Sequence, residues 1–285
     1  MDQRFFNLYD EYIHGFIERR SFLERLGQLA GSTAAASAIL PLIENNMARA
    51  ETVPETDARI SSETVIIPGV PGLKGYLVKP KGGKAKKPAV IVIHENRGLN
   101  PHIKDVTRRL ATEGFIALGV DYLSPIGGTP DDQDKGAQMI GTLKPEDVVK
   151  SSRAALAYLK GREDVNGKVG AVGFCWGGGA VNDLAVADRH LDAGVPYYGR
   201  QPAADQVAAI KAPLLLQYAG MDERIDAGIP AFEAALKKAK KRYQIYVYEG
   251  AQHGFNNDTS AARYNKPVAD LAWSRTLAFF RKELT

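Results

Sequence analysis

A single cysteine lies in a setting that is typical of a catalytic nucleophile. Cys175 is the one cysteine among 285 residues, in the sequence GFCWG at residues 173–177. An apolar, β-rich run ends just before it, and a run of glycines at 177–179 follows. A nucleophile on a sharp strand-to-helix turn needs small neighbours, and the start of the next helix favours its thiolate. We therefore expect Cys175 to be a nucleophile, although a lone cysteine is more often a small buried apolar residue.

Two later residues offer a base and an acid for this cysteine. Asp222 and His253 each follow an apolar, β-rich run, so the chain order is nucleophile, acid, histidine. His253 would hold the thiol proton and later protonate a leaving alcohol. Asp222 would orient the imidazole and favour its cationic form. Glu223 and Asp226 are alternative acids, and Asp222 could also be a simple turn residue.

An acyl intermediate at Cys175 also needs an oxyanion hole. The backbone N–H of Trp176, directly after the nucleophile, is one expected donor. The second is the N–H of Asn96, in the loop after a strand that ends in His94-Glu95. His94 and Glu95 are also metal-ligand types, but no His-x-x-x-His spacing accompanies them. We expect no metal and no cofactor.

Apolar runs and amphipathic segments alternate after residue 62, which predicts an α/β fold. The run at 88–95 is almost continuously apolar, as in a strand buried on both faces of a parallel sheet. The runs 64–68 and 73–79 flank a Gly-Val-Pro-Gly turn and predict a hairpin. Further strands are expected at 115–121, 168–174, 193–198, 213–219 and 242–248, and helices at 103–113, 145–160, 176 onward, 229–240 and 267–283. This order predicts a doubly wound, mostly parallel sheet with helices on both faces. The polar segment 127–132 is expected as a loop near the site.

The first fifty residues differ in pattern from the rest. Apolar residues recur at helical spacing from 4 to 17, and an uncharged stretch, 26–43, follows the pair Arg19-Arg20. A small-x-small pattern at 48–50 is of the kind that signal peptidases cut. Together these features resemble a twin-arginine export signal and predict a periplasmic protein. The alternative is a cytoplasmic protein whose N-terminal amphipathic helices pack on its main domain.

The expected domains follow from these patterns. Residues 1–50 form a helical N-terminal segment, residues 51–62 a polar linker, and residues 63–285 a catalytic domain. We expect no stable membrane anchor, because Pro41 and many small residues weaken the one uncharged stretch. The oligomeric state is not predicted by any pattern in the chain.

The composition excludes several classes of protein. The chain is 45% hydrophobic and 25% charged, with a net charge of +4. Collagen-like and disordered chains do not have this composition, and one cysteine excludes internal disulfides and cysteine-based zinc sites. The basic residues are scattered without an aromatic-basic stripe, so we expect no nucleic-acid partner.

The chain resembles the dienelactone hydrolase family, a cysteine branch of the α/β-hydrolases, from about residue 60 to 285. The resemblance lies in the element order and in the spacing of Cys175, Asp222 and His253. It implies an α/β-hydrolase fold and a small-molecule ester or lactone substrate, cleaved through an acyl-cysteine without a cofactor. It also implies that Glu95 holds or deprotonates the resting thiol. From the residues alone, Glu95 could equally be a capping or salt-bridged loop residue.

The chain departs from this family where substrate would bind. Family members that act on dienelactone grip its carboxylate with two arginines, but the matching segments here read DYLSP at 121–125 and HGFNN at 253–257. Arg97 and Arg200 could replace them, since both follow expected strand ends. Tyr122 and Phe255 are further pocket candidates. Two other functions stay open: a non-catalytic protein on this fold, and a redox sensor that lacks a second thiol in the chain.

Overall fold

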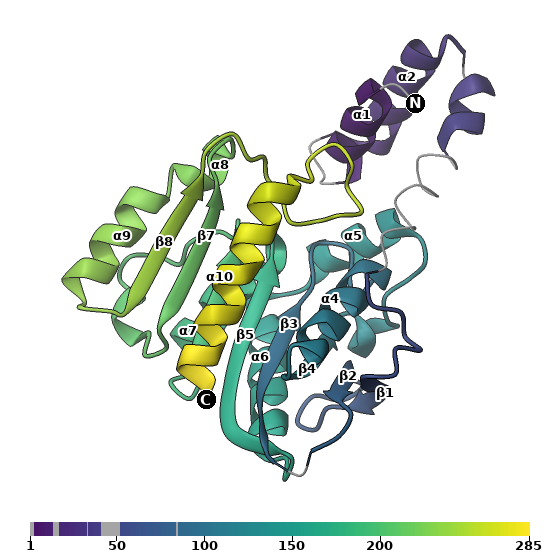
Figure 1. The fold of residues 1–285 in the computed structure, drawn as a ribbon. Coiled ribbons are helices and arrows are strands. Elements are labelled where there is room, and N and C mark those ends of the chain that lie inside the picture. The colour runs from purple at the N-terminus through teal and green to yellow at the C-terminus, as the bar shows by residue number, and fades with distance from the viewer. Residues whose placement is uncertain (1–2, 14–16, 33, 41–51, 84) are drawn as a thin grey trace.

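The computed structural model describes residues 3–13, 17–32, 34–40, 52–83 and 85–285. Within these residues, eight strands form one sheet with the order β1-β2-β4-β3-β5-β6-β7-β8 (Figure 1). Its strands are β1 (Ile60–Ile66), β2 (Lys74–Pro80), β3 (Lys87–Ile93), β4 (Ile116–Asp121), β5 (Val165–Phe174), β6 (Ala193–Tyr197), β7 (Leu214–Ala219) and β8 (Tyr243–Tyr248). Only β2 runs against its neighbours, so the mostly parallel sheet is confirmed.

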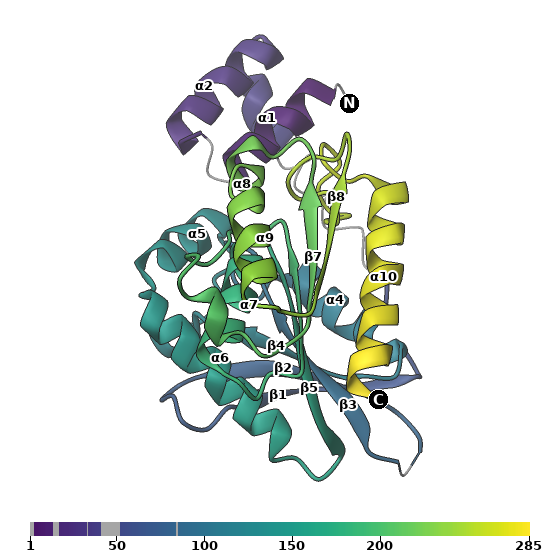
Figure 2. The same cartoon turned by 90° about the vertical axis from the view of Figure 1, so that its left-hand side faces the viewer.

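Helices cover both faces of this sheet, as Figure 2 shows. The helices of residues 60–285, called the catalytic part below after the expectation from the sequence, are α4 (Pro101–Thr112), α5 (Gln133–Thr142), α6 (Pro145–Lys160), α7 (Trp176–Ala187), α8 (Glu223–Asp226), α9 (Ile229–Lys238) and α10 (Lys266–Leu284). Apolar residues of α6, α7 and α9 belong to one core cluster, and those of α4 and α10 belong to another. The sheet therefore has a core on each side.

Strand β3 shows why the sheet is central. Ala89, Ile91 and Ile93 pack into one core, whereas Val90 and Val92 pack into the other, and none of these side chains is exposed. Because successive side chains of a strand point to opposite faces, a continuous apolar run is stable only where both faces are covered.

Two expectations need correction. The first strand begins at Ile60, where it pairs with Pro80, so the expected polar linker overlaps the hairpin. Val53 is also buried, and its N–H donates to the Asp105 carboxylate at 2.8 Å.

The second correction is α5, which begins directly after the expected loop. Asp132 caps the start of this helix, because its side chain accepts hydrogen bonds from the backbone N–H groups of Asp134 and Lys135. From the sequence, Asp132 reads only as one more polar residue of a loop.

The N-terminal segment is helical, as expected, in the part that the structure describes. Helices α1 (Gln3–Ile13) and α2 (Arg19–Ala30) pack on each other, and residues 34–40 form a further helical turn. They lie beyond the carboxyl ends of β7 and β8 (Figure 2). The expected cleavage pattern at 48–50 lies outside the described residues. No helix among the described residues has the length and apolarity to cross a membrane.

Candidate active site

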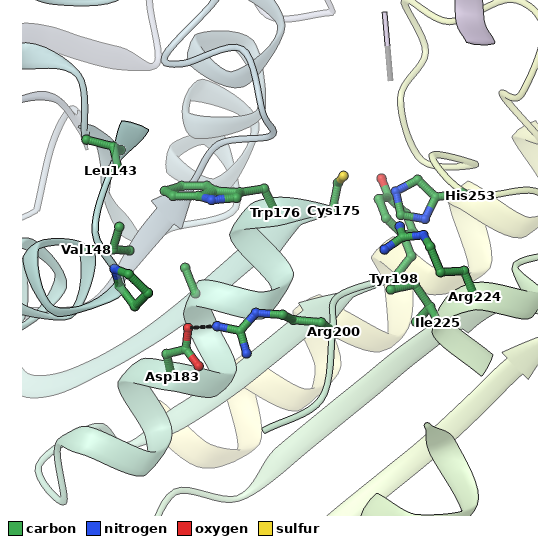
Figure 3. A pocket seen from close by; sticks show the side chains of 12 residues that line it. Leu143, Val148, Cys175, Trp176, Asp183, Tyr198, Arg200, Arg224, Ile225 and His253 are labelled. Atoms are coloured by element: carbon green, nitrogen blue, oxygen red, sulfur yellow. Dashed lines mark hydrogen bonds and ion pairs between the residues drawn. The ribbon is translucent and has the colours of Figure 1, made fainter. Parts of the chain in front are cut away.

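Cys175 lies in a sharp turn between β5 and α7, at the carboxyl edge of the sheet (Figure 3). Its backbone has a φ of 55° and a ψ of −114°, a conformation that costs free energy in L-residues. The turn can close because its neighbours lack side chains: a Cβ on Gly173 would lie 2.2 Å from the carbonyl oxygen of Gly177. The predicted strand–cysteine–helix turn is confirmed.

His253 lies beside both an acid and the cysteine. Its Nδ1 pairs with Oδ2 of Asp222, and its imidazole lines the same cavity as the Cys175 side chain (Figure 3). The alternative acid Glu223 is exposed to solvent, and Oδ1 of Asp226 is buried without a hydrogen-bond partner. The fold thus brings Asp222 into contact with the imidazole, in preference to either alternative.

The surroundings of His253 favour its charged form. Burial by itself would lower the pKa of His253, but the negative charge of Cys175 and the hydrogen bonds to Asp222 and Cys175 raise it to about 10. His94 behaves in the opposite way, since burial lowers its pKa. Only the first of these two imidazoles is therefore suited to carry a proton next to the sulfur.

The two expected oxyanion donors come from segments in direct contact. A Cβ on Gly177 would lie 2.4 Å from the carbonyl oxygens of both Ile93 and His94, so the start of α7 rests against the end of β3. The Trp176 N–H belongs to the first turn of α7, where backbone donors have no partner within the helix. Asn96 lies in the loop that leaves β3 and is half-buried.

Glu95 lies in this same loop and is 5% exposed. Its Oε2 accepts a hydrogen bond from Nδ2 of Asn257 at 2.8 Å, whereas Oε1 is buried without a hydrogen-bond partner. Glu95 is thus a buried carboxylate, one oxygen of which is left for another donor. The alternative was a capping or salt-bridged loop residue; the partner of Glu95 here is the neutral amide of Asn257.

A cavity of about 320 Å³ opens at Cys175. Its walls are Leu143, Pro145, Val148, Cys175, Trp176, Ala180, Asp183, Tyr198, Arg200, Arg224, Ile225 and His253. The indole of Trp176 reaches from the cysteine toward Leu143 and Val148 (Figure 3), and it stacks on the His94 ring at 5.2 Å. The cavity is therefore apolar on the side of the indole and charged on the side of the arginines.

Comparison with known proteins gives the family. The model of the dienelactone hydrolase family matches residues 73–284. A Saccharolobus solfataricus protein named "Putative carboxymethylenebutenolidase" is 33% identical in an alignment of 248 positions that covers 74% of this chain and 94% of that protein. This chain belongs to the dienelactone hydrolase family. It is a hydrolase that acts on ester or lactone bonds. Separately, a family model described as YqhI-like matches residues 1–31.

Solved structures agree with this assignment. The Klebsiella pneumoniae protein described as "Putative Dienelactone Hydrolase" has a TM-score of 0.70 and is 27% identical. The match covers 78% of this chain and 99% of that protein. The dienelactone hydrolase-like promiscuous phosphotriesterase P91, from metagenomic libraries, has a TM-score of 0.72 at 23% identity, over 80% of this chain and 100% of its own. The chain has the α/β-hydrolase fold of these dienelactone hydrolases.

Among the four predicted pocket residues of this dienelactone hydrolase, Arg200 alone lines the cavity at Cys175, where it pairs with Asp183. Phe255 is fully buried and packs on Tyr198 and Tyr248, because its loop turns the ring into the core. The pocket prediction for Phe255 is wrong.

The other two pocket candidates lie next to different cavities. Tyr122 is 2% exposed and supports the Trp176 ring edge-on at 5.4 Å, while its hydroxyl bonds Ser152 at 2.7 Å. It borders a neighbouring cavity of about 280 Å³ instead. Arg97 borders a cavity of about 500 Å³ between the N-terminal helices and residues 131–134. Neither residue lines the cavity at Cys175, so their part in binding substrate stays a prediction.

Three residues of the site were missed by sequence reasoning. Arg224 lines the cavity from α8. The one feature of the sequence that could have pointed to it is its position, two residues after Asp222. Leu143 lines it from the end of α5, a helix that was not predicted. Asn257 lies in the segment where the family resemblance implies an arginine, and its bond to Glu95 was not predicted. Among the described residues, no group of three or more His, Cys, Asp or Glu side chains could hold a metal ion.

Proposed function

We propose that this dienelactone hydrolase cleaves esters or lactones with a triad of Cys175, His253 and Asp222, through a covalent acyl-cysteine. One observation carries the proposal: the imidazole of His253 bonds the Asp222 carboxylate and lines the same cavity as the Cys175 side chain (Figure 3). A nucleophile, a base within reach of it and an acid that orients the base are the parts that acyl transfer needs.

In the first half of the reaction, the Cys175 sulfur attacks the carbonyl carbon of the substrate. The negative charge that develops on the carbonyl oxygen accepts hydrogen bonds from the N–H groups of Trp176 and Asn96. The carbon–oxygen bond to the alcohol then breaks, and His253 gives its proton to the leaving alkoxide. The products of this half are an alcohol and a thioester on Cys175; in a lactone both remain parts of one molecule.

In the second half, water releases the acid. Neutral His253 takes a proton from a water molecule while the oxygen of that water attacks the thioester carbonyl. The carbon–sulfur bond then breaks. The sulfur leaves as a thiolate beside the protonated imidazole, which restores the starting ion pair. Asp222 keeps the imidazole in the right tautomer during both halves.

Glu95 has a part in the resting enzyme under this proposal. Its Oε1 is buried without a hydrogen-bond partner, so it is available to hold or take the thiol proton. Asn257 holds the other oxygen at 2.8 Å and keeps the carboxylate in the loop next to Asn96.

The substrate we propose does not depend on a carboxylate. The segments 121–125 and 253–257 contain no arginine, and in the second of them Asn257 is engaged with Glu95. A neutral amide cannot form the paired, charged hydrogen bonds with which a guanidinium grips a carboxylate. The indole of Trp176 and the side chains of Leu143 and Val148 instead offer an apolar surface to one part of a simple ester or lactone.

The test compares Cys175→Ala and Cys175→Ser with the unaltered enzyme on short p-nitrophenyl esters and simple lactones. We expect Cys175→Ala to lose about a thousandfold or more in kcat/KM, and intact-mass spectrometry to show an acyl adduct on the unaltered enzyme only. Peptide mapping should place that adduct on Cys175. Unchanged turnover by purified Cys175→Ala would exclude the proposed mechanism.

The substrate class is tested with pairs of esters that differ only in a carboxylate. We expect the neutral ester of each pair to be hydrolysed at least as efficiently as the acid. A strong preference for the carboxylate would instead assign a binding role to Arg200 or Arg224, which line the cavity.

A further inference from the structure

The N-terminal helices rest on the loops that carry the site residues. Their apolar cluster contains the buried side chains of Leu8, Tyr9, Phe22, Leu26 and Ala36. Ala262, in the loop that follows His253, packs against this cluster. Figure 1 shows α1 and α2 next to this yellow loop, beyond the carboxyl edge of the sheet. The helices therefore contact the catalytic part at the edge where Cys175 lies.

Arg97 joins these helices to the loop of Glu95 and Asn96. Its Nη2 donates to the backbone carbonyl of Tyr12 at 3.4 Å, and its guanidinium carbon lies 6.0 Å from the centre of the Tyr12 ring. Only 7% of its side chain is exposed. A buried guanidinium needs partners, and here an N-terminal helix supplies two of them, a carbonyl and an aromatic face.

Asp134 extends this contact to the second N-terminal helix. Its Oδ1 lies 3.4 Å from Nη1 of Arg97, and its Oδ2 lies 2.9 Å from Nη1 of Arg19. The next residue, Arg20, is 89% exposed in its side chain and pairs with Glu24 within α2. The two arginines that suggested an export signal thus differ in their partners: Arg19, 61% exposed in its side chain, pairs with Asp134 outside the N-terminal helices, whereas Arg20 pairs within α2.

The charge of Arg97 acts on the candidate active site. Burial lowers the pKa of Arg97 to about 10, while negative charges around it, including Glu95 and Cys175, oppose that fall. Arg97 lies two positions after Glu95 in the same loop, so its buried positive charge attracts negative charge at the site. The charged or titratable groups that face it are Tyr9, Glu95, Asp132, Asp134 and Cys175, with Arg19 behind Asp134.

We propose that α1 and α2 are a resident cap of the active site, and that this cap holds Arg97 as a positioning residue for Glu95 and Cys175. Arg97 does not line the cavity at Cys175, so it acts through these two groups and not on the substrate. This inference rests on the proposed function, because it assigns Arg97 to the ionised resting site. Cleavage at 48–50 would remove both helices, so this inference requires that the chain is not cut there.

The first test measures kcat/KM against pH for the full chain, with intact mass confirming that residue 1 is retained. We expect Arg97→Gln to move the acid limb of the profile to higher pH by about one unit, because the ionised acids lose a neighbouring cation. Arg97→Lys keeps the charge and should leave the limb close to its original position. A residue with a purely structural role would lower the rate at every pH and leave the limb in place.

The second test separates the cap from Arg97 itself and uses a matched pair in α2. Arg19→Gln breaks the ion pair with Asp134, and Arg20→Gln makes the same change of charge one residue later, on the exposed side. We expect hydrogen exchange of the α1 and α2 amides to speed up by about threefold in Arg19→Gln and to stay unchanged in Arg20→Gln. Tyr12→Ala, which removes the ring beside Arg97, should shift the acid limb in the same direction as Arg97→Gln, and it remains informative if Arg97→Gln does not fold.

The outcomes distinguish this inference from the proposed function. If Cys175→Ala is inactive but the acid limb is the same in Arg97→Gln as in the unaltered enzyme, the role of Arg97 is wrong and the triad stands. Equal exchange rates in Arg19→Gln and Arg20→Gln would show that α2 is not held to the catalytic part, which would overturn the cap. Full activity of Cys175→Ala would remove the basis of both.

Discussion

Asn257 donates a hydrogen bond from Nδ2 to Oε2 of Glu95 at 2.8 Å, across 162 residues of sequence. Oδ1 of the same asparagine accepts from the backbone N–H and the hydroxyl of Thr259. The amide therefore connects the loop after β3 to the loop after β8, and it leaves the second oxygen of Glu95 buried without a hydrogen-bond partner. This connection lies where the family resemblance implies an arginine.

The first prediction concerns this amide. Asn257→Asp keeps the bonds to Thr259 but replaces the donor to Glu95 with a second carboxylate. We expect a loss of about 1–3 kcal/mol in the free energy of unfolding at pH 7.5, measured with urea. The deficit should shrink at pH 5, because the paired carboxylates take up a shared proton in the folded state. Asn257→Ala, which loses the donor without adding charge, is the control and should not recover in this way.

The second prediction concerns the protonation of His253. Because its pKa is raised to about 10 by Cys175 and Asp222 against the effect of burial, its imidazole should stay protonated through neutral pH. Cys175→Ala removes the neighbouring negative charge, so the pKa of His253 should fall. NMR titration of labelled histidines would follow this, with His94 as an internal control that stays neutral because burial lowers its pKa. A His253 pKa that is the same in both proteins would contradict the ion pair.

The third prediction concerns the glycines of the turn. Gly177→Ala would place a Cβ 2.4 Å from two backbone carbonyl oxygens, so we expect a loss of about 1–3 kcal/mol in unfolding free energy and a displaced Cys175. Gly141→Ala is the matched control, since its Cβ would meet nothing within 4 Å on helix α5. Alanine there should stabilise the protein by about 0.5–1 kcal/mol. Thermal unfolding of both variants measures the difference, and equal effects would refute the packing argument.

The fourth prediction concerns chain length in the substrate. Leu143 and Val148 border both the cavity at Cys175 and the neighbouring cavity, of about 320 and 280 Å³. Leu143→Ala removes part of the shared wall, so it should make room for a longer acyl chain and raise kcat/KM for hexanoyl relative to acetyl esters by about tenfold, the effect of one or two buried methylenes. Leu271→Ala, at an exposed position on α10, should leave this ratio unchanged. A constant ratio in Leu143→Ala would mean that substrates do not extend toward Leu143.

Much of this protein follows from its sequence alone. Continuous apolar runs predict the buried parallel strands, because such runs are stable only where both faces are covered. The boundaries of helix α6 and the turn at Cys175 also follow, since Pro145 starts a helix and only glycines permit the turn. These features are local, and local backbone chemistry decides them. The model of the dienelactone hydrolase family matches residues 73–284, which contain these strands and this turn.

The tertiary structure alone decided which distant residues meet. No spacing rule brings Asn257 to Glu95 or Tyr12 to Arg97, because each pair lies on separate loops and helices whose approach depends on how the whole sheet is covered. The pocket prediction for Phe255 failed for the same reason: an aromatic residue beside His253 can face the cavity or the core, and only packing decides. Likewise, the composition of the first fifty residues does not distinguish a cleaved export signal from helices that stay packed on the catalytic part. The contacts of α1 and α2 do bear on that choice, since burial and ion pairs across the two parts depend on three-dimensional position.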